Sequence, residues 1–171
     1  MTEVVPAQSG EALNRFIELS QEYVDWIMAE AKRRYPGLDI GRFTSERGYE
    51  DVSKKYPGEH VPPNGCVLLA TSNGKACGCV AVGRLTKTIC EMRTLYVRPA
   101  YRGSGVGRRL AEASIAQARG LGYRRMRLDT LAFLETAAAL YRSLGFEETK
   151  PYHRVPPALR GRIRFLELVL R

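Results

Sequence analysis

The chain has 171 residues and 44% of them are hydrophobic, which indicates one globular domain, residues 1–171, with a buried core. It contains no run of eighteen apolar residues and no basic, apolar leader, so we expect a cytoplasmic protein without a membrane partner. The net charge of +9 lies in the second half, because residues 1–83 carry 9 − 11 = −2 and residues 84–171 carry 18 − 7 = +11. The basic half predicts either an anionic ligand or a solvated basic surface.

Nucleic acid is one anionic partner that such a half could bind. However, the arginines are scattered through patterned segments, and the chain lacks the spacing of RNP, zinc-finger or helix-turn-helix motifs. The sequence therefore does not favour nucleic-acid binding. The four cysteines form no CxxC pair and have no histidine at zinc-ligand spacing, so we expect buried thiols and no metal. They are Cys66, Cys77, Cys79 and Cys90.

The first half begins with a helical pattern. Apolar residues recur at intervals of three and four over residues 10–34, which predicts an amphipathic helix that ends at Tyr35-Pro36-Gly37. A short strand at 3–6 precedes it. Residues 36–65 are rich in proline, glycine and charge, and we expect a loop there with a lid-like helix around 46–55.

The pattern then becomes that of strands. Two apolar runs, 66–71 and 76–82, flank Ser72-Asn73-Gly74-Lys75 and predict a hairpin, and a third strand follows at 89–97. The next segments predict a strand–helix–strand unit with two parallel strands. They are a glycine-rich turn at 99–104, a helix at 105–120 and a strand at 125–130.

The last segments are predicted as a helix, 134–144, that ends at Gly145, a strand at 146–149 and a closing strand at 163–170. The fold class expected from this order is α+β, with a mixed but largely antiparallel sheet flanked by helices.

The turn before the predicted helix at 105–120 has glycine at alternate positions, Gly103, Gly105 and Gly107. Without side chains, successive backbone N–H groups can converge on one anion at a helix N-terminus, so we expect a phosphorylated ligand. Nearby charge favours the same ligand. It comes from Arg102, Arg108 and Arg109.

The glycines alone leave other interpretations of this turn open. A tight turn could use the glycines for packing alone. A P-loop would require Lys-Ser or Lys-Thr after the glycines, and a dinucleotide fold would require GxGxxG directly after its strand. Here Pro99-Ala100-Tyr101-Arg102 intervenes, although Asp129 lies at the distance of a ribose-binding acid.

The turn resembles the signature of the GNAT acyltransferase superfamily, [Q/R]-x-x-G-x-[G/A], at Arg102, Gly105 and Gly107. Similar flanking motifs occur at 95–99 and 140–146. The resemblance implies an acyl-CoA N-acyltransferase fold whose central sheet splays between strands 4 and 5, with acyl-CoA in the gap. One departure is Leu134, where many relatives have an asparagine that contacts CoA.

The resemblance also implies the cofactor site. The pantetheine arm would pair with the strand edge at Leu95, Tyr96 and Val97 as an added strand. The backbone N–H of Leu95 would stabilise the oxyanion of the tetrahedral intermediate. The phosphates would lie on the turn. Its contacts would come from Arg102, Gly103, Ser104, Gly105, Val106, Gly107 and Arg108.

Two side chains are candidates for proton transfer. Glu91 matches the position of a catalytic glutamate in some GNAT proteins, and a strand period of two would place it on the same face as Leu95. It lies about 13 Å away along a strand, so it would act through water. Tyr141 matches the tyrosine that protonates the CoA thiolate. Glu91 could instead be a solvated or salt-bridged strand acid, and Tyr141 could serve only in helix packing.

The expected function is therefore transfer of an acetyl group from acetyl-CoA, as co-substrate, to a primary amine of a small molecule or protein in a ternary complex. The alternative is a catalytically silent acyl-CoA-binding module on the same fold. The acceptor stays unidentified, and a homodimer is one assembly that the resemblance allows. Several acids in the 36–65 loop could wall a basic acceptor. They are Asp39, Glu46, Glu50, Asp51 and Glu59.

Overall fold

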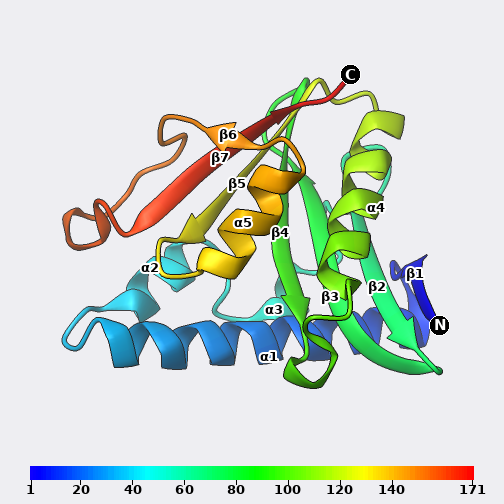
Figure 1. The fold of residues 1–171 in the computed structure, drawn as a ribbon, viewed down its shortest axis with the longest axis horizontal. Helices are drawn as coiled ribbons and strands as arrows, with labels where there is room; N and C mark the ends of the chain where they lie inside the picture. Colours follow the sequence, from blue (N-terminus) through cyan, green and yellow to red (C-terminus); the bar gives the residue numbers. More distant parts are fainter.

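The computed structural model describes residues 1–171, and its strands form one seven-stranded sheet of order β1-β2-β3-β4-β5-β7-β6 (Figure 1). Neighbouring strands are antiparallel except for the parallel pair β4–β5, as predicted. The strands are β1 (Thr2–Pro6), β2 (Cys66–Ser72), β3 (Lys75–Arg84), β4 (Ile89–Val97), β5 (Arg125–Leu131), β6 (Glu147–Glu148) and β7 (Ile163–Val169). The helices are α1 (Gly10–Arg34), α2 (Ile40–Glu46), α3 (Val52–Lys55), α4 (Val106–Gly120) and α5 (Glu135–Ser143), with short 3-10 turns η1 (Pro99–Tyr101) and η2 (Pro157–Leu159).

The first segment with a helical period forms the predicted helix. Helix α1 occupies residues 10–34 and buries one stripe of side chains, including Phe16, Leu19 and Ile27. Its last turn carries Lys32, Arg33 and Arg34, whose charges oppose the partial negative charge at the helix C-terminus.

Residues 36–65 differ from the prediction, because two short helices form in place of one around 46–55. Helix α2 begins after Asp39, whose side chain accepts a hydrogen bond of 3.0 Å from the backbone N–H of Arg42. Helix α3 begins after Asp51, whose side chain accepts one of 3.1 Å from the N–H of Ser53. These caps satisfy N–H groups that the first turn of a helix leaves without partners.

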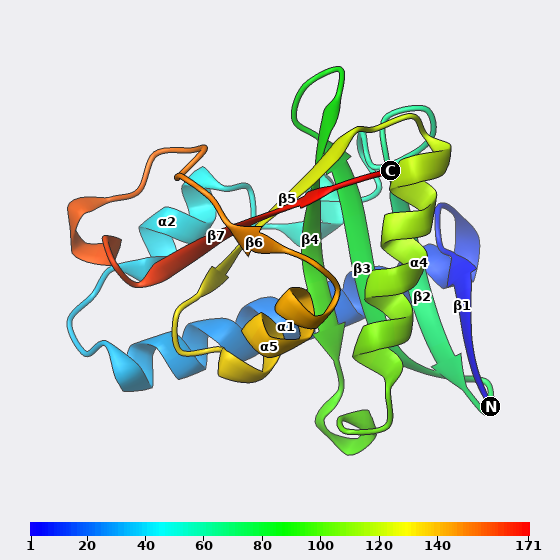
Figure 2. The same ribbon diagram turned by 45° about the horizontal axis from the view of Figure 1, so that its top comes forward.

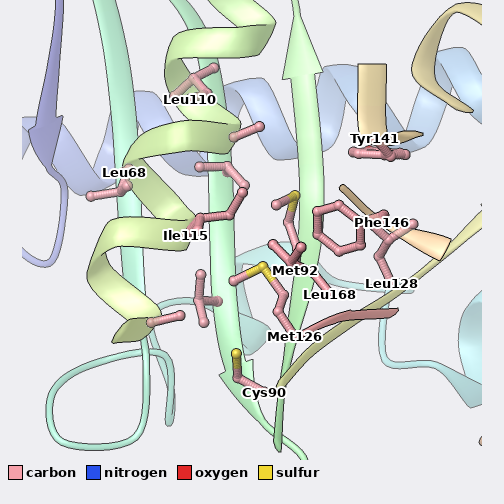
Figure 3. Packing of buried hydrophobic residues seen from close by; sticks show 14 of the residues in the cluster. Leu68, Cys90, Met92, Leu110, Ile115, Met126, Leu128, Tyr141, Phe146 and Leu168 are labelled. Carbon is pink, nitrogen blue, oxygen red and sulfur yellow. The ribbon is translucent and has the colours of Figure 1, made fainter. Parts of the chain in front are cut away.

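Helices cover both faces of the sheet. Helices α4 and α5 lie on one face, whereas α1 crosses the other with α2 and α3 beside it (Figures 1 and 2). The α4 face holds the larger cluster of 21 buried residues, drawn in part in Figure 3. The α1 face holds a second cluster of 12 buried residues. All four cysteines are buried and free, which confirms the expectation of buried thiols.

No helix has both the length and the apolar content that crossing a membrane requires.

Close packing between β3 and α4 fixes the position of the glycine-rich turn. A Cβ on Gly78 would lie 2.8 Å from the backbone oxygen of Tyr96 and 2.9 Å from Cδ1 of Leu110. Glycine at this position therefore lets α4 approach the sheet closely, and the N-terminus of α4 is held beside the end of β4.

Gly78→Ala should lower the free energy of unfolding by about 1–3 kcal/mol, because the added methyl group has no space in this core. Gly120→Ala is the control, since a Cβ there meets nothing within 4 Å at the last residue of α4. It should leave stability unchanged or raise it by up to about 1 kcal/mol. Urea denaturation of both variants checks this, and equal stability of Gly78→Ala and wild type would contradict the packing argument.

Candidate active site

The parallel strands β4 and β5 separate after the third residue of each strand. Their paired register runs only from Ile89 opposite Arg125 to Glu91 opposite Arg127. Beyond it β5 stays paired with β7 as far as Leu131, while residues 92–97 of β4 have no partner on this side. The two strands diverge visibly toward their carboxyl ends (Figure 1). We call the space beside residues 92–97 the β4–β5 gap.

A β-bulge in β4 lies at the start of this gap. Ala81 of β3 pairs with Arg93 and Cys79 pairs with Tyr96, so one residue of β3 faces two residues of β4. Thr94, within the bulge, has a φ of 55°, which is uncommon for a residue other than glycine. The bulge reverses the alternation of side chains along the strand.

The expected common face of Glu91 and Leu95 is therefore wrong. Met92 and Leu95 both contact the cluster on the α4 face, although they are three residues apart. Glu91 points to the opposite side of the sheet, where Arg47 and Tyr152 surround it. The backbone of Leu95, which the predicted oxyanion contact uses, still lies along the β4–β5 gap.

A cavity of about 790 Å³ extends through the gap from one face of the sheet to the other. On the α4 side its wall includes the glycine-rich turn and Tyr141, and on the α1 side it includes Tyr23 and Trp26. Several residues expected at the cofactor site line it. They are Leu95, Tyr96, Val97, Arg102, Gly103, Gly105, Gly107 and Arg108.

The turn presents backbone, not side chains, to this cavity. Gly103 and Gly105 have φ values of 78° and 87°, a left-handed conformation that glycine adopts without strain. Gly105 is the N-cap of α4, so the N–H groups of the first turn point toward the cavity. The side chains of Ser104 and Val106 face elsewhere, because the Ser104 hydroxyl donates to the Tyr101 carbonyl at 2.6 Å and Val106 is buried.

The two arginines beside the turn have different contacts. Arg102 donates from Nε to the backbone oxygen of Val97 at 2.9 Å, and its guanidinium lies 4.8 Å from the ring centroid of Trp26. It thereby fastens the turn to the end of β4. Arg108 donates to Ser143 Oγ at 2.7 Å and lies on the cavity wall between α4 and α5. Arg108 thus places a positive charge close to the start of α4.

Tyr141 of α5 is 7% exposed and lines the cavity. Its ring packs edge-on against Phe146 with centroids 5.8 Å apart. Burial, and then the nearby Asp129 carboxylate, raise the pKa of Tyr141 above its usual 10. The phenol therefore keeps its proton at neutral pH, as a proton donor must.

Glu91 is 1% exposed and does not line the cavity. Arg47 Nη2 lies 3.2 and 3.3 Å from its two oxygens, the Tyr152 hydroxyl donates to it at 2.7 Å, and Arg93 forms a further ion pair. Burial alone would raise the pKa of Glu91, but Arg93 and Arg47 lower it below the ordinary value. The ionised carboxylate is a weak proton acceptor that already has three donors.

Asp129 of β5 is the carboxylate that faces the cavity close to Tyr141. Its side chain is 25% exposed, and its Oδ2 contacts both Arg47, at 3.4 Å, and His153 Nε2. Burial alone would lower the pKa of His153, but the hydrogen bond to Asp129 raises it. In the sequence, Asp129 stands out only by its distance from the glycine-rich turn, which is that of a ribose-binding acid. What brings Asp129 into the site is that β5 has left β4 at this point.

Comparisons with known proteins agree with this geometry. Residues 22–146 match the model of the acetyltransferase (GNAT) family. An uncharacterised N-acetyltransferase of Schizosaccharomyces pombe is 45% identical over 146 residues, which are 84% of this chain and 82% of that protein.

Two solved structures share the fold. A putative acyl-CoA N-acyltransferase from Klebsiella pneumoniae has a TM-score of 0.72 at 22% identity, over 100% of this chain and 99% of that one. PaiA N-acetyltransferase from Thermoplasma acidophilum, in complex with coenzyme A, has a TM-score of 0.71 at 17% identity, over 99% of both chains. The matched family model covers the split strands, the glycine-rich turn and Tyr141, and the chain belongs to the GNAT family of acetyltransferases.

Proposed function

We propose that the protein, acting as one domain, transfers the acetyl group of acetyl-CoA to a primary amine of a small molecule or protein by direct attack in a ternary complex. The observation that carries this proposal is the continuity of the cavity from the glycine-rich turn, through the β4–β5 gap, to the α1 side. Two substrates can enter from opposite faces and meet beside Leu95 and Tyr141. A silent acyl-CoA-binding module would not need the open second side. A cytoplasmic location stays a prediction.

The donor would bind through backbone and charge. The pyrophosphate would lie on the N–H groups at the start of α4, with Gly103, Gly105 and Gly107 leaving room for it and Arg108 nearby. Ser104 and Val106 would contribute through their backbones, and Arg102 by holding the turn in place. The amide groups of pantetheine would pair with residues 95–97, whose edge has no partner in β5.

The chemistry would proceed at the thioester carbonyl. The amine nitrogen attacks the carbonyl carbon, and the backbone N–H of Leu95 stabilises the oxyanion of the tetrahedral intermediate. As the intermediate collapses, the carbon–sulfur bond breaks and Tyr141 donates a proton to the departing CoA sulfur. The products are the amide and free CoA, and the proton lost by the amine restores Tyr141 through solvent.

An alkylamine is largely protonated at neutral pH, so a carboxylate must help remove its proton. The sequence predicts Glu91 as the base. Because its own oxygens do not reach the cavity, we propose that Glu91 acts indirectly, through Arg47 and Asp129. We assign the direct contact with the amine to Asp129.

Tyr141→Phe should lower kcat by about 10²-fold or more, because the variant keeps the ring packing but loses the proton for the thiolate. Release of CoA thiol in the presence of an amine panel measures this. The rise in melting temperature on adding acetyl-CoA should match that of wild type, which controls for donor binding. Unchanged kcat in Tyr141→Phe would remove the tyrosine from the mechanism.

Glu91→Gln should destabilise the fold by about 3–5 kcal/mol at pH 7, because Arg47 and Arg93 would lose their buried counter-charge. The pKa of Glu91 is lowered in the folded state, so its contribution is fully present above the unfolded pKa of about 4.3. It is lost as pH falls through the lower folded pKa.

Urea denaturation at pH 7 and at successively lower pH should therefore show that the difference in unfolding free energy between wild type and Glu91→Gln decreases in acid. Glu46→Gln is the control, because Glu46 makes only an exposed pair with Arg42 and should cost less than about 1 kcal/mol. A difference in unfolding free energy that stays constant with pH would mean that Glu91 is not held ionised by the arginines.

A further inference from the structure

On the α1 side of the gap, the cavity wall contains a group of apolar side chains beside the charged Glu30, Arg34 and Arg47. Its lining includes half-buried side chains from three separate elements, together with the buried Leu159 of η2. We call this part of the cavity the acceptor chamber and define it by Ile27, Phe43, Leu131, Phe133, Leu159 and Ile163. Binding of an apolar ligand to such a chamber is favourable, because the ligand displaces water from apolar surface.

The charges around the acceptor chamber neutralise one another. Glu30 pairs with Arg34 at 3.6 Å, and the guanidinium of Arg34 lies 4.6 Å from the ring centroid of Phe133. Glu135 pairs with Arg164 at 3.0 Å. The chamber therefore offers no set of free carboxylates for a ligand with several positive charges.

The expectation that acids of the 36–65 loop wall a basic acceptor is wrong, because none of them lines the cavity. Asp39 and Asp51 cap the two short helices, Glu46 pairs with Arg42, and Glu50 accepts a hydrogen bond from the Ser45 hydroxyl at 2.9 Å. Their carboxylates serve local structure.

Asp129 lies where the acceptor chamber meets the reaction gap. Both of its recorded contacts, with Arg47 and His153, are made by Oδ2. Oδ1 has no hydrogen bond or ion pair within the protein and is not buried, so it can accept a hydrogen bond from a single ammonium group. The nearby Tyr141 marks the side on which the thioester would lie.

From these observations we infer that the acceptor is a monoamine with an apolar body, such as an arylalkylamine or alkylamine. Its body occupies the acceptor chamber and its nitrogen contacts Asp129 Oδ1. This inference rests on the proposed function and adds a substrate class to it: polyamines and aminosugars are poor acceptors because their further polar groups would meet apolar walls without partners.

The test is an initial-rate assay of CoA thiol release with acetyl-CoA and three amines: phenethylamine, spermidine and glucosamine. Phenethylamine should give a kcat/KM at least about tenfold above the other two, in line with the discrimination that apolar pockets provide. Phe43→Ala should lower kcat/KM for phenethylamine about tenfold, mainly through KM, and should leave acetyl-CoA binding unchanged. Asp129→Asn should lower kcat/KM with every amine.

Val169→Ala is the matched control, because Val169 is an apolar side chain that is 49% exposed and lies outside the cavity. It should leave the preference among amines unchanged. Fastest turnover of spermidine or glucosamine would overturn the inference and leave the proposed function standing. Faster reaction of octanoyl-CoA than of acetyl-CoA, if Phe43→Ala abolishes the difference, would also overturn the inference, because the chamber would then hold the acyl chain, and it would change the acyl group in the proposed function.

A binding measurement tests the inference when no amine reacts. If no amine releases CoA, calorimetry of phenethylamine with the protein–CoA complex decides the inference by itself. Binding that Phe43→Ala weakens would support the ligand class while the proposed function fails. Absence of binding would overturn both.

Discussion

Arg47 links the two strands at the point where they separate. Its guanidinium contacts Glu91, the last residue of β4 that pairs with β5. It also contacts Asp129, which lies two residues beyond the last residue of β5 that pairs with β4. Backbone hydrogen bonds hold β4 and β5 together at one end, and this ion-pair cluster bridges them as they diverge. The cavity, the free edge of β4 and the positions of both substrates depend on that divergence.

The cluster also explains how a region with many arginines is stabilised. Arg47 and Arg93 share Glu91, and the hydroxyl of Tyr152 adds a hydrogen bond from the loop before β7. A buried charge is tolerated when partners surround it in this way, whereas removal of one partner leaves the others uncompensated. Elsewhere in the second half two arginines likewise share one carboxylate, because Arg125 and Arg127 both contact Glu167.

The local patterns of the sequence were sufficient to predict most elements. The stripe of α1, the hairpin turn at Asn73-Gly74 and the glycine-rich turn depend on short-range periodicity and on backbone conformations that glycine favours, which neighbouring residues reveal. The parallel β4–β5 pair followed from the helix between the strands. The resemblance of the turn to the GNAT signature then gave the family, which the comparisons showed.

Features that depend on distant contacts could not be predicted. The bulge at Thr94 adds one residue to β4 without any signal in composition, and it places Glu91 and Leu95 on opposite faces. Arg47 lies in the segment predicted as a loop with a lid-like helix, and only the fold brings it to the carboxylates of two strands. The acids of that loop looked like a wall for a basic ligand because capping and local pairing were not visible in the pattern.

In the proposed arrangement, the β4–β5 gap and the glycine-rich turn hold the acyl donor while the α1 side stays open for the amine. A crystal structure of the complex with CoA tests it most directly. We expect pyrophosphate oxygens within hydrogen-bond distance of the N–H groups between Gly103 and Gly107, and pantetheine amides paired with the backbone of residues 95–97. CoA bound elsewhere, or a pantetheine arm that fills the acceptor chamber, would contradict it.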